Sequence, residues 1–239
     1  KVVLGDDGQV AHVEPRPRYD SHRLIEDMMI AANVCAAESL EKIHQPCMYR
    51  VHDQPTPDKL EELRDFLSTL NLRLAKGQVL RPEQFNEILS AVKDTPQSHL
   101  VSVVVLRSQA QAIYSPENLG HFGLNLGRYA HFTSPIRRYA DLLVHRALVR
   151  GLQFGEGPLS DAEAHRFADI GQHISQTERR AAVAARDAIN RYTAAFLAER
   201  VGASFSGRFS GVSRFGLFVS LNESGADGFI PAATLGDDF

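Results

Sequence analysis

The chain has 239 residues, 44% of them hydrophobic and 23% charged, with a net charge of −3. This composition excludes a disordered protein, because it supplies enough apolar surface for one large or two modest domains. No apolar run approaches the roughly 18 residues of a membrane span, and no cationic segment precedes an apolar one, so we expect a soluble, cytoplasmic protein without a membrane partner. Cys35 and Cys47 are too few for a disulfide framework and lack zinc-site spacing, so we expect two buried thiols.

Charge is distributed unevenly along the chain. Residues 128–214 contain 13 basic and 8 acidic residues, a net charge of +5, whereas the segments on both sides are acidic. All 13 bases in this stretch are arginine, whose planar guanidinium binds phosphate through two parallel hydrogen bonds. A solvated helix face remains the simpler explanation for any one of them. The stretch as a whole is typical of a protein that binds a polyanion.

The chain begins with a predicted β-hairpin. Residues 1–3 and 10–13 have strand character, and residues 5–8 form a turn that contains Asp6 and Asp7. Pro15 and Pro17 then mark a loop.

A long helix is predicted from Ser21, a residue type that favours the N-cap position. Its apolar residues recur at helical spacing and are expected to face inward: Ile25, Met28, Met29, Ala32, Cys35, Ala36 and Leu40. His22, Glu26 and Asn33 fall on a different face.

Two further helices are predicted, one over residues 58–70 and one that begins near Pro82. We interpret both as structural scaffold, because neither carries candidate catalytic residues. Residues 98–107 contain four valines, which by propensity favour a strand. The apolar pattern alone does not separate this short strand from a buried helix.

The densest segment lies at residues 120–139. A hydroxyl at Thr133 or Ser134 followed by Pro135 predicts the start of a helix, and apolar residues continue it: Ile136, Ala140, Leu143, Val144, Ala147 and Leu148. A further helical region spans residues 160–200, and from residue 203 alternating apolar residues broken by glycines predict a small β domain.

The predicted helix start at Pro135 breaks a rule of helix electrostatics. The helix dipole favours acidic residues in the first turn, yet Arg137 and Arg138 stand there. Such violations are expected at functional sites, and a helix N-terminus with two guanidinium groups would bind phosphate. Asp141 could orient Arg137 through an i, i+4 pair. The alternative is a capped helix with solvated arginines.

Histidines offer another interpretation of the same segment. His121, His131, Asp141 and His145 lie within 25 residues and could serve a metal-dependent hydrolase. Their spacing matches no strong metal signature, so we favour histidines that bind the backbone or RNA and assign no metal ligand.

Three blocks resemble the ribonuclease II and ribonuclease R exoribonucleases, whose catalytic domain is called RNB. The first is residues 21–33, SHRLIEDMMIAAN; the second combines GHFGL at 120–124 with HFTSPIRRYADLLVHR at 131–146; the third is ERRA at 178–181 with AARD at 184–187. His131, the paired arginines and Ala185 look closer to the ribonuclease R branch. The segment after residue 203 resembles the opening strands of the OB-fold RNA-binding domain that follows the catalytic domain.

The resemblance implies an α+β chain with two parts. Residues 1–202 would be the C-terminal, largely helical part of an RNB catalytic domain, and residues 203–239 an incomplete OB-fold β-barrel. It also implies processive 3′-to-5′ hydrolysis of single-stranded RNA to nucleoside 5′-monophosphates, with Mg²⁺, by a parent that is expected to be monomeric. No protein partner can be identified from the sequence.

The family binds its metal through a block of spaced aspartates upstream of the serine-histidine-arginine helix. The paired acids of this chain lack that spacing: Asp6-Asp7, Glu26-Asp27, Glu61-Glu62 and Asp237-Asp238. We therefore expect a fragment that is inactive by itself. The alternative is a non-catalytic RNA-binding protein or pseudoenzyme.

The resemblance assigns site residues position by position. Arg137 matches the arginine that contacts the phosphate being cut, and Glu26 matches a carboxylate near the terminal nucleotide. On the β domain, bases would stack on Phe215 and Phe218, although Pro231 stands where many relatives carry a histidine. The remaining positions expected to bind RNA are His22, Arg23, Thr133, Ser134, Arg138, Tyr139 and Arg214. A bend at Gly216 would be needed to turn both phenylalanines outward.

Overall fold

The structure is a computed structural model that describes residues 2–14, 17–77 and 79–236. The expectations for Lys1, Pro15 and Asp237-Asp238 lie outside these residues. The helices are α1 (Asp20–Lys42), α2 (Pro57–Thr69), α3 (Pro82–Ala91), α4 (Ser98–Ser108), α5 (Tyr139–Leu152), α6 (Asp161–His165) and α7 (Phe167–Ala198). The strands are β1 (Val2–Leu4), β2 (Val10–Val13), β3 (Tyr49–Val51), β4 (Ile113–Ser115), β5 (Gly207–Ser213), β6 (Gly216–Leu221) and β7 (Asp227–Pro231).

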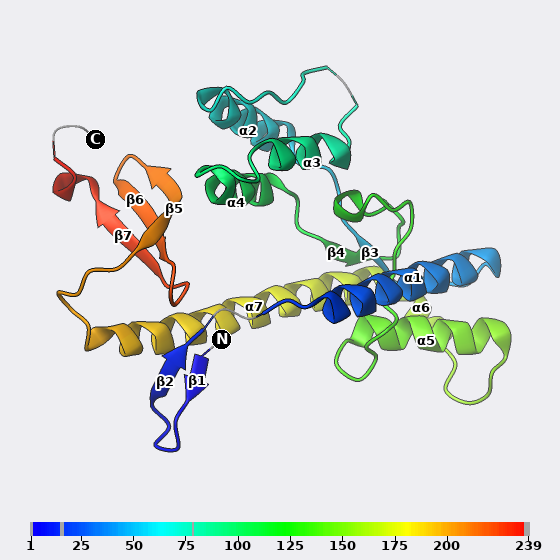
Figure 1. Cartoon of the computed structure of the whole chain (residues 1–239). Helices are drawn as coiled ribbons and strands as arrows, with labels where there is room; N and C mark the ends of the chain where they lie inside the picture. Colours follow the sequence, from blue (N-terminus) through cyan, green and yellow to red (C-terminus); the bar gives the residue numbers. More distant parts are fainter. Residues whose placement is uncertain (1, 15–16, 78, 237–239) are drawn as a thin grey trace.

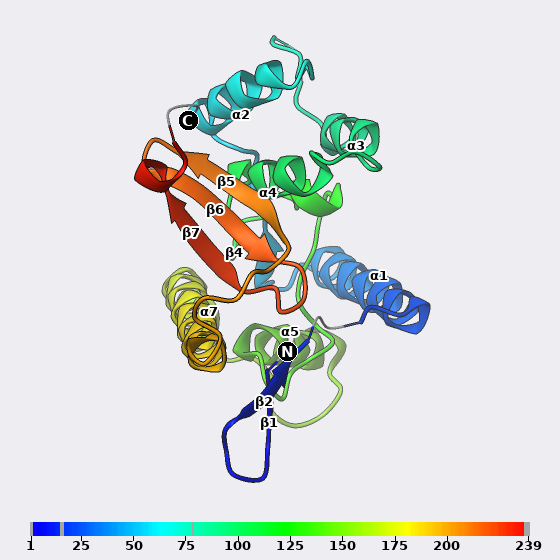
Figure 2. The same cartoon turned by 60° about the vertical axis from the view of Figure 1, so that its left-hand side comes forward.

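Helix α7, with 32 residues, extends from the region of α5 and α6 to the sheet β5-β6-β7 (Figure 1). The β1–β2 hairpin and strand β4 pack against it, and α5 contacts both α7 and α1. Helices α2, α3 and α4 form a separate group above α7 in Figure 1. The antiparallel sheet β5-β6-β7 follows α7 and contacts α4 through β5 (Figure 2).

Two hydrophobic clusters hold these groups together. The first joins α1, β3, α5 and the start of α7 through residues such as Leu40, Val51, Leu143, Val144 and Phe167. The second joins α2, α3 and α4 through Leu63, Leu67, Phe85, Ile88, Val101 and Val105. Phe122 packs against the second cluster, edge-to-face on Phe85 at a ring separation of 5.9 Å. The segment at residues 120–124 is thereby fixed to the α2–α4 group.

The predicted strand at residues 98–107 is wrong, because this segment is helix α4. Its buried residues Val101, Val105 and Ser108 are four and three positions apart, so they share one helical face against α2 and α3. Packing of that face outweighs the strand propensity of the valines. The alternative that the apolar pattern left open, a buried helix, is the observed one.

The predicted helix start at Pro135 is also wrong. Residues 135–137 form a turn, and α5 begins at Tyr139 with Arg138 as its N-cap in extended conformation. Ile136 is consequently fully exposed rather than part of the apolar stripe. Neither Thr133 nor Ser134 caps α5 with its side chain; instead the carbonyl of Ser134 accepts hydrogen bonds from the amides of Arg137 and Arg138.

The first half of α1 is exposed, contrary to the expected inward face. Ile25 and Met28 are 55% and 59% exposed, and burial begins only at Asn33. Within the described residues, the first core cluster packs against the second half of this helix. Cys47 is buried as expected, whereas Cys35 is exposed on the outer side of α1, so the expectation of two buried thiols is half wrong.

Several other expectations for the fold agree with the structure, although the N-cap of α1 is Tyr19 rather than Ser21. The N-terminal hairpin and the helices near residues 58 and 82 form, and the predicted 160–200 helix is α6 and α7, separated by Arg166. The change from helix to strand lies between Ala198 and Gly207. The sheet β5-β6-β7 is an open meander, so the OB-fold assignment and the domain boundary at residue 202 stay predictions. Among the described residues, none of the helices combines the length and the hydrophobicity that a membrane span requires.

Gly171 of α7 provides a test of this packing. A Cβ atom at position 171 would lie 2.7 Å from the carbonyl oxygen of Tyr114 in β4. Alanine normally stabilises a helix by about 1 kcal/mol relative to glycine, but this backbone contact reverses the sign. We predict that Gly171→Ala lowers the free energy of unfolding by about 1–3 kcal/mol, measured by urea denaturation.

The control is Ala182→Gly at an exposed position of the same helix. This substitution changes only the helix propensity of the position and should lower the free energy of unfolding by about 1 kcal/mol. A Gly171→Ala chain as stable as the parent chain, or more stable, would contradict the packing of α7 on β4.

Candidate phosphate-binding site

The loop that precedes α5 is held by buried side chains rather than by regular secondary structure. Asn33 of α1 is buried; its amide nitrogen donates to the Tyr129 hydroxyl at 2.9 Å, and its amide oxygen accepts from the Phe132 backbone at 2.9 Å. His145 of α5 donates through Nε2 to the Phe132 carbonyl at 2.8 Å, and its ring stacks on the Phe132 ring at 4.2 Å. Two helices therefore fix the path of the loop.

Asp141 fixes the turn at the end of this loop. Its side chain is fully buried, and Oδ1 accepts hydrogen bonds from the Ser134 backbone at 2.8 Å and from Nη2 of Arg138 at 2.7 Å. The expected pair between Asp141 and Arg137 is wrong. Because Arg138 is the N-cap residue in extended conformation, its side chain folds back over the first turn of α5 to the third helical residue.

The two arginines consequently differ in availability. The Arg138 side chain is mostly buried in its pair with Asp141. Arg137 is exposed, and among the described residues its guanidinium has no ion pair or hydrogen bond. Three buried polar atoms around the turn also lack a partner within the described part of the chain: Oγ1 of Thr133, Nε of Arg138 and Oδ2 of Asp141. The turn therefore holds one free cationic group and several unused hydrogen-bonding atoms.

A chain of rings and charges links this loop to α7. His131 Nδ1 lies 2.9 Å from the Tyr114 hydroxyl, and the Arg50 guanidinium stacks over the Tyr114 ring at 4.6 Å. The terminal nitrogens Nη1 and Nη2 of Arg50 also donate hydrogen bonds to the Glu178 carboxylate in α7, at 2.7 and 3.3 Å. Burial, reinforced by the nearby charges of Arg138 and Arg50, lowers the pKa of His131 to about 3. Its imidazole is therefore neutral near pH 7.

A cavity of about 750 Å³ opens beside the loop. Its lining includes His22, Glu26 and Asn33, which the sequence placed on one face of α1, together with Tyr129 and Arg138. The structure thus brings two of the expected RNA-binding residues of α1 and one of the α5 region to a single cavity. Arg23 points elsewhere, toward Asp20 at 3.7 Å, and Tyr139 is half-exposed at the start of α5.

Arg18 and His52 are site residues that sequence reasoning missed. Arg18 lines the cavity and forms an ion pair with Glu26. His52 binds Ala110 through Nε2 and accepts from the Gly123 amide at Nδ1, both at 2.8 Å, which holds the turn that places Leu124 in the cavity wall. A basic residue in a proline-marked loop was the one available signal for Arg18. No sequence pattern singles out His52.

The residues expected on the β domain lie apart from this cavity, on the sheet β5-β6-β7. Arg214 and Phe215 form the two-residue turn between β5 and β6, and the Arg214 guanidinium stacks on the Phe215 ring at 4.6 Å. Phe218 follows on β6. Both phenylalanines are exposed, and Gly216, which lies between them, has a φ of 147°.

The residues of the expected histidine constellation have separate hydrogen-bond partners. His121 accepts from the Leu124 amide at 3.2 Å, while His131, His145 and Asp141 have the partners described above. No three side chains of histidine, cysteine, aspartate or glutamate come together to hold a metal ion in the described ranges.

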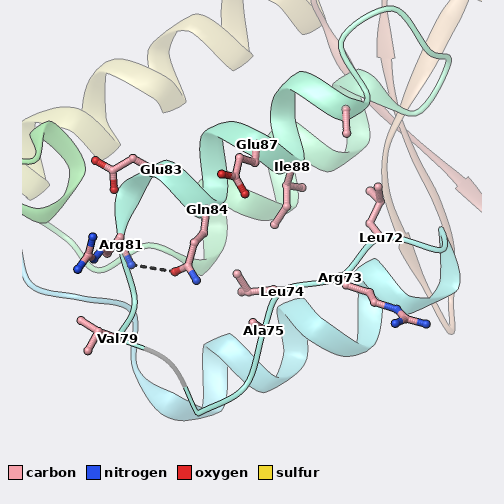
Figure 3. Close-up of a pocket in the computed structure, with 11 residues that line it drawn as sticks. Leu72, Arg73, Leu74, Ala75, Val79, Arg81, Glu83, Gln84, Glu87 and Ile88 are labelled. Carbon is pink, nitrogen blue, oxygen red and sulfur yellow. Dashed lines mark hydrogen bonds between the residues drawn. The ribbon is translucent and has the colours of Figure 1, made fainter.

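A separate cavity of about 790 Å³ lies between α3 and the loop after α2 (Figure 3). Its lining combines apolar residues such as Leu72 and Leu74 with Arg81, Glu83 and Glu87, and it contains none of the expected site residues.

A model of the RNB domain family matches residues 1–153. The chain belongs to the RNB family. Ribonuclease R of Escherichia coli strain K12 is 38% identical to this chain over 247 aligned residues. The alignment covers 100% of this chain and 30% of that protein. The chain thus spans about a third of the length of the curated relatives it matches.

Solved structures extend the similarity to the RNB fold. Mycoplasma genitalium RNase R, in complex with ribose-methylated single-stranded RNA, has a TM-score of 0.88 and 30% identity, and the match covers 100% of this chain and 38% of that one. Yeast Ssd1, described as a pseudonuclease, has a TM-score of 0.72 at 20% identity, covering 90% of this chain and 27% of that one. It shows the shared fold alone.

Removal of the Asp141 carboxylate tests the architecture of the turn. Asp141→Ala leaves the Ser134 amide and the mostly buried Arg138 guanidinium without their acceptor. We predict a loss of about 3–5 kcal/mol in the free energy of unfolding, measured by urea denaturation.

Asp141→Asn keeps an acceptor but removes the charge, so it should cost less. Asp161→Ala is the matched control, because Asp161 is 77% exposed in its pair with Arg150 and surface pairs contribute about 0–1 kcal/mol. Equal losses in Asp141→Ala and Asp161→Ala would contradict the role of Asp141.

Proposed function

We propose that this chain supplies the phosphate-binding and nucleotide-binding surface of a processive exoribonuclease that degrades single-stranded RNA from the 3′ end to nucleoside 5′-monophosphates. The observation that carries the proposal is the unequal pair of arginines. Arg138 is fixed by buried Asp141, while Arg137 is exposed on the fixed turn and has no ion pair or hydrogen bond with any other described residue. Family membership and the similarity to ribonuclease R support it.

Arg137 is the catalytic residue in this proposal. Water attack on a phosphodiester increases the negative charge on the phosphoryl oxygens, and a guanidinium carried at that position by a fixed turn stabilises this charge. Asp141 positions the turn, so the entropy of ordering the turn is lost when the chain folds and not when RNA binds. Thr133, Ser134, Arg138 and Tyr139 would contact the same or the adjacent phosphate.

The cavity beside the turn would hold the terminal nucleotide. Glu26 would accept a hydrogen bond from the ribose hydroxyls, and a contact to the 2′-hydroxyl distinguishes RNA from DNA. Arg18, paired with Glu26, orients this carboxylate. His22 also lines the cavity, and its Nδ1 accepts from the Tyr19 amide, which fixes the ring at the start of α1. Arg23 would bind the backbone of the RNA at the rim.

Farther along the RNA, Arg214, Phe215 and Phe218 would bind unpaired nucleotides by stacking and charge. This part of the proposal includes the assignment of residues 203–239 to an OB-fold domain. It also includes a cytoplasmic location and a monomeric parent protein.

Ribonuclease R homology implies a metal-dependent nuclease, but the described residues do not fit a metal centre, because they contain no cluster of suitable ligands. In this proposal Mg²⁺ is bound by parts of the complete protein outside this chain.

The second candidate function is non-catalytic RNA binding. The observation that favours it is that no cluster of metal ligands forms in the described ranges. Sequencing the gene upstream of the codon for Lys1 separates the two: a block of four spaced aspartates supports the enzyme, and its absence from the complete protein supports the RNA-binding protein.

Arg137→Ala in the complete protein should reduce the turnover of single-stranded RNA by about a hundredfold or more, because one preorganised charge donor is lost. Release of nucleoside monophosphates measures it. Arg166→Ala, at an exposed arginine before α7, is the matched control and should leave turnover unchanged. Turnover of Arg137→Ala within about threefold of the parent enzyme would reject the catalytic role.

The chain alone should bind single-stranded RNA without hydrolysing it. Incubation with labelled oligoribonucleotide and Mg²⁺ should release no nucleotide, while fluorescence anisotropy detects binding. Mg²⁺-dependent release by the purified chain would show that the metal ligands lie within it.

A further inference from the structure

The end of α4 contributes an arginine to the surface of the sheet β5-β6-β7. Arg107 is in the last turn of α4, and α4 packs against β5 (Figure 2). A Cβ atom added at Gly211 of β5 would lie 3.6 Å from Nη1 of Arg107 and 3.3 Å from Cδ2 of Phe218. The guanidinium therefore lies over the bare backbone of Gly211, beside the Phe218 ring.

Strand register places an aromatic pair on the same face. Gly211 is directly opposite Phe218, and Phe218 is directly opposite Phe229 of β7, so all three positions share one face of the sheet. The two rings lie 5.0 Å apart and are 42% and 45% exposed. The opposite face carries aliphatic residues such as Leu217, Val219 and Ile230. Phe218 and Phe229 thus form an exposed aromatic platform.

Arg107 is exposed, and within the described part of the chain it has no ion pair or hydrogen bond. Its position at the end of α4 suits the helix dipole, but a dipole requires no particular direction of the side chain. Arg208 lies farther along the same face, opposite Ser220, and Asp227 is opposite Ser220 on the other side. The face therefore offers a cation at the aromatic pair itself.

We infer that Arg107, Phe218 and Phe229 form one nucleotide-binding subsite for single-stranded RNA, shared between α4 and the sheet. A base stacks on the phenylalanine pair, and Arg107 binds the phosphate next to that base. Gly211 provides the space for the guanidinium to approach. The inference rests on the proposed function and adds a contact that joins the helical part of the chain to the sheet during RNA binding.

The test measures the affinity of the chain for a labelled twelve-nucleotide oligouridylate by fluorescence anisotropy at several salt concentrations. Arg107→Gln should weaken binding about fivefold and reduce the slope of log affinity against log salt by about 0.7, the value for one phosphate contact on a single strand. Phe229→Leu should weaken binding about fivefold or more with an unchanged salt slope. Arg107→Lys should restore the slope.

Arg81→Gln is the matched control, because Arg81 is also exposed and belongs to the same helical group but lies beside α3 (Figure 3). It should bind like the parent chain. Arg137→Gln, measured in parallel, reports on the proposed function separately. Unchanged affinity and salt slope in Arg107→Gln, with weakened binding in Arg137→Gln, overturn this inference alone. A parent chain that does not bind the oligonucleotide overturns both.

Discussion

The buried carboxylate of Asp141 determines the arrangement of the site. A fully buried charge is costly unless it is paired, and Asp141 meets this requirement with the Ser134 amide and the Arg138 guanidinium. These two bonds close the turn before α5 and hold one arginine of the Arg137-Arg138 pair mostly buried against Asp141. The neighbouring arginine is left exposed on a rigid support, which is what recognition of a phosphate requires.

Around this pair, the loop depends on side chains from distant segments. Asn33, Tyr114 and His145 come from α1, β4 and α5, and each binds a residue of the loop. Because the loop lacks its own regular hydrogen bonds, its geometry is only as rigid as the packing of these elements. This explains why the turn that carries Arg137 forms next to the first hydrophobic cluster.

The sequence predicted the elements with strong periodicity and the residues with unusual chemistry. The common face of His22, Glu26 and Asn33 followed from helical spacing, and the cavity lies there. Pairing of Asp141 with Arg138 did not follow, because a proline and a hydroxyl indicated a helix start four residues before the real one. The valines of α4 were ambiguous for a different reason: their burial against α2 and α3 is a long-range contact that local propensity does not contain.

Helix α7 links the core and the sheet as one uninterrupted rod of 32 residues, about 48 Å long at 1.5 Å per residue. Gly171 fixes its first half on β4, while its far end leads to β5. Insertion of a single residue between these points would rotate everything after it by about 100°. The sheet would then present another side to α4, and Arg107 would lose its place over Gly211. The length of α7 between Gly171 and β5 therefore determines whether Arg107 lies over Gly211.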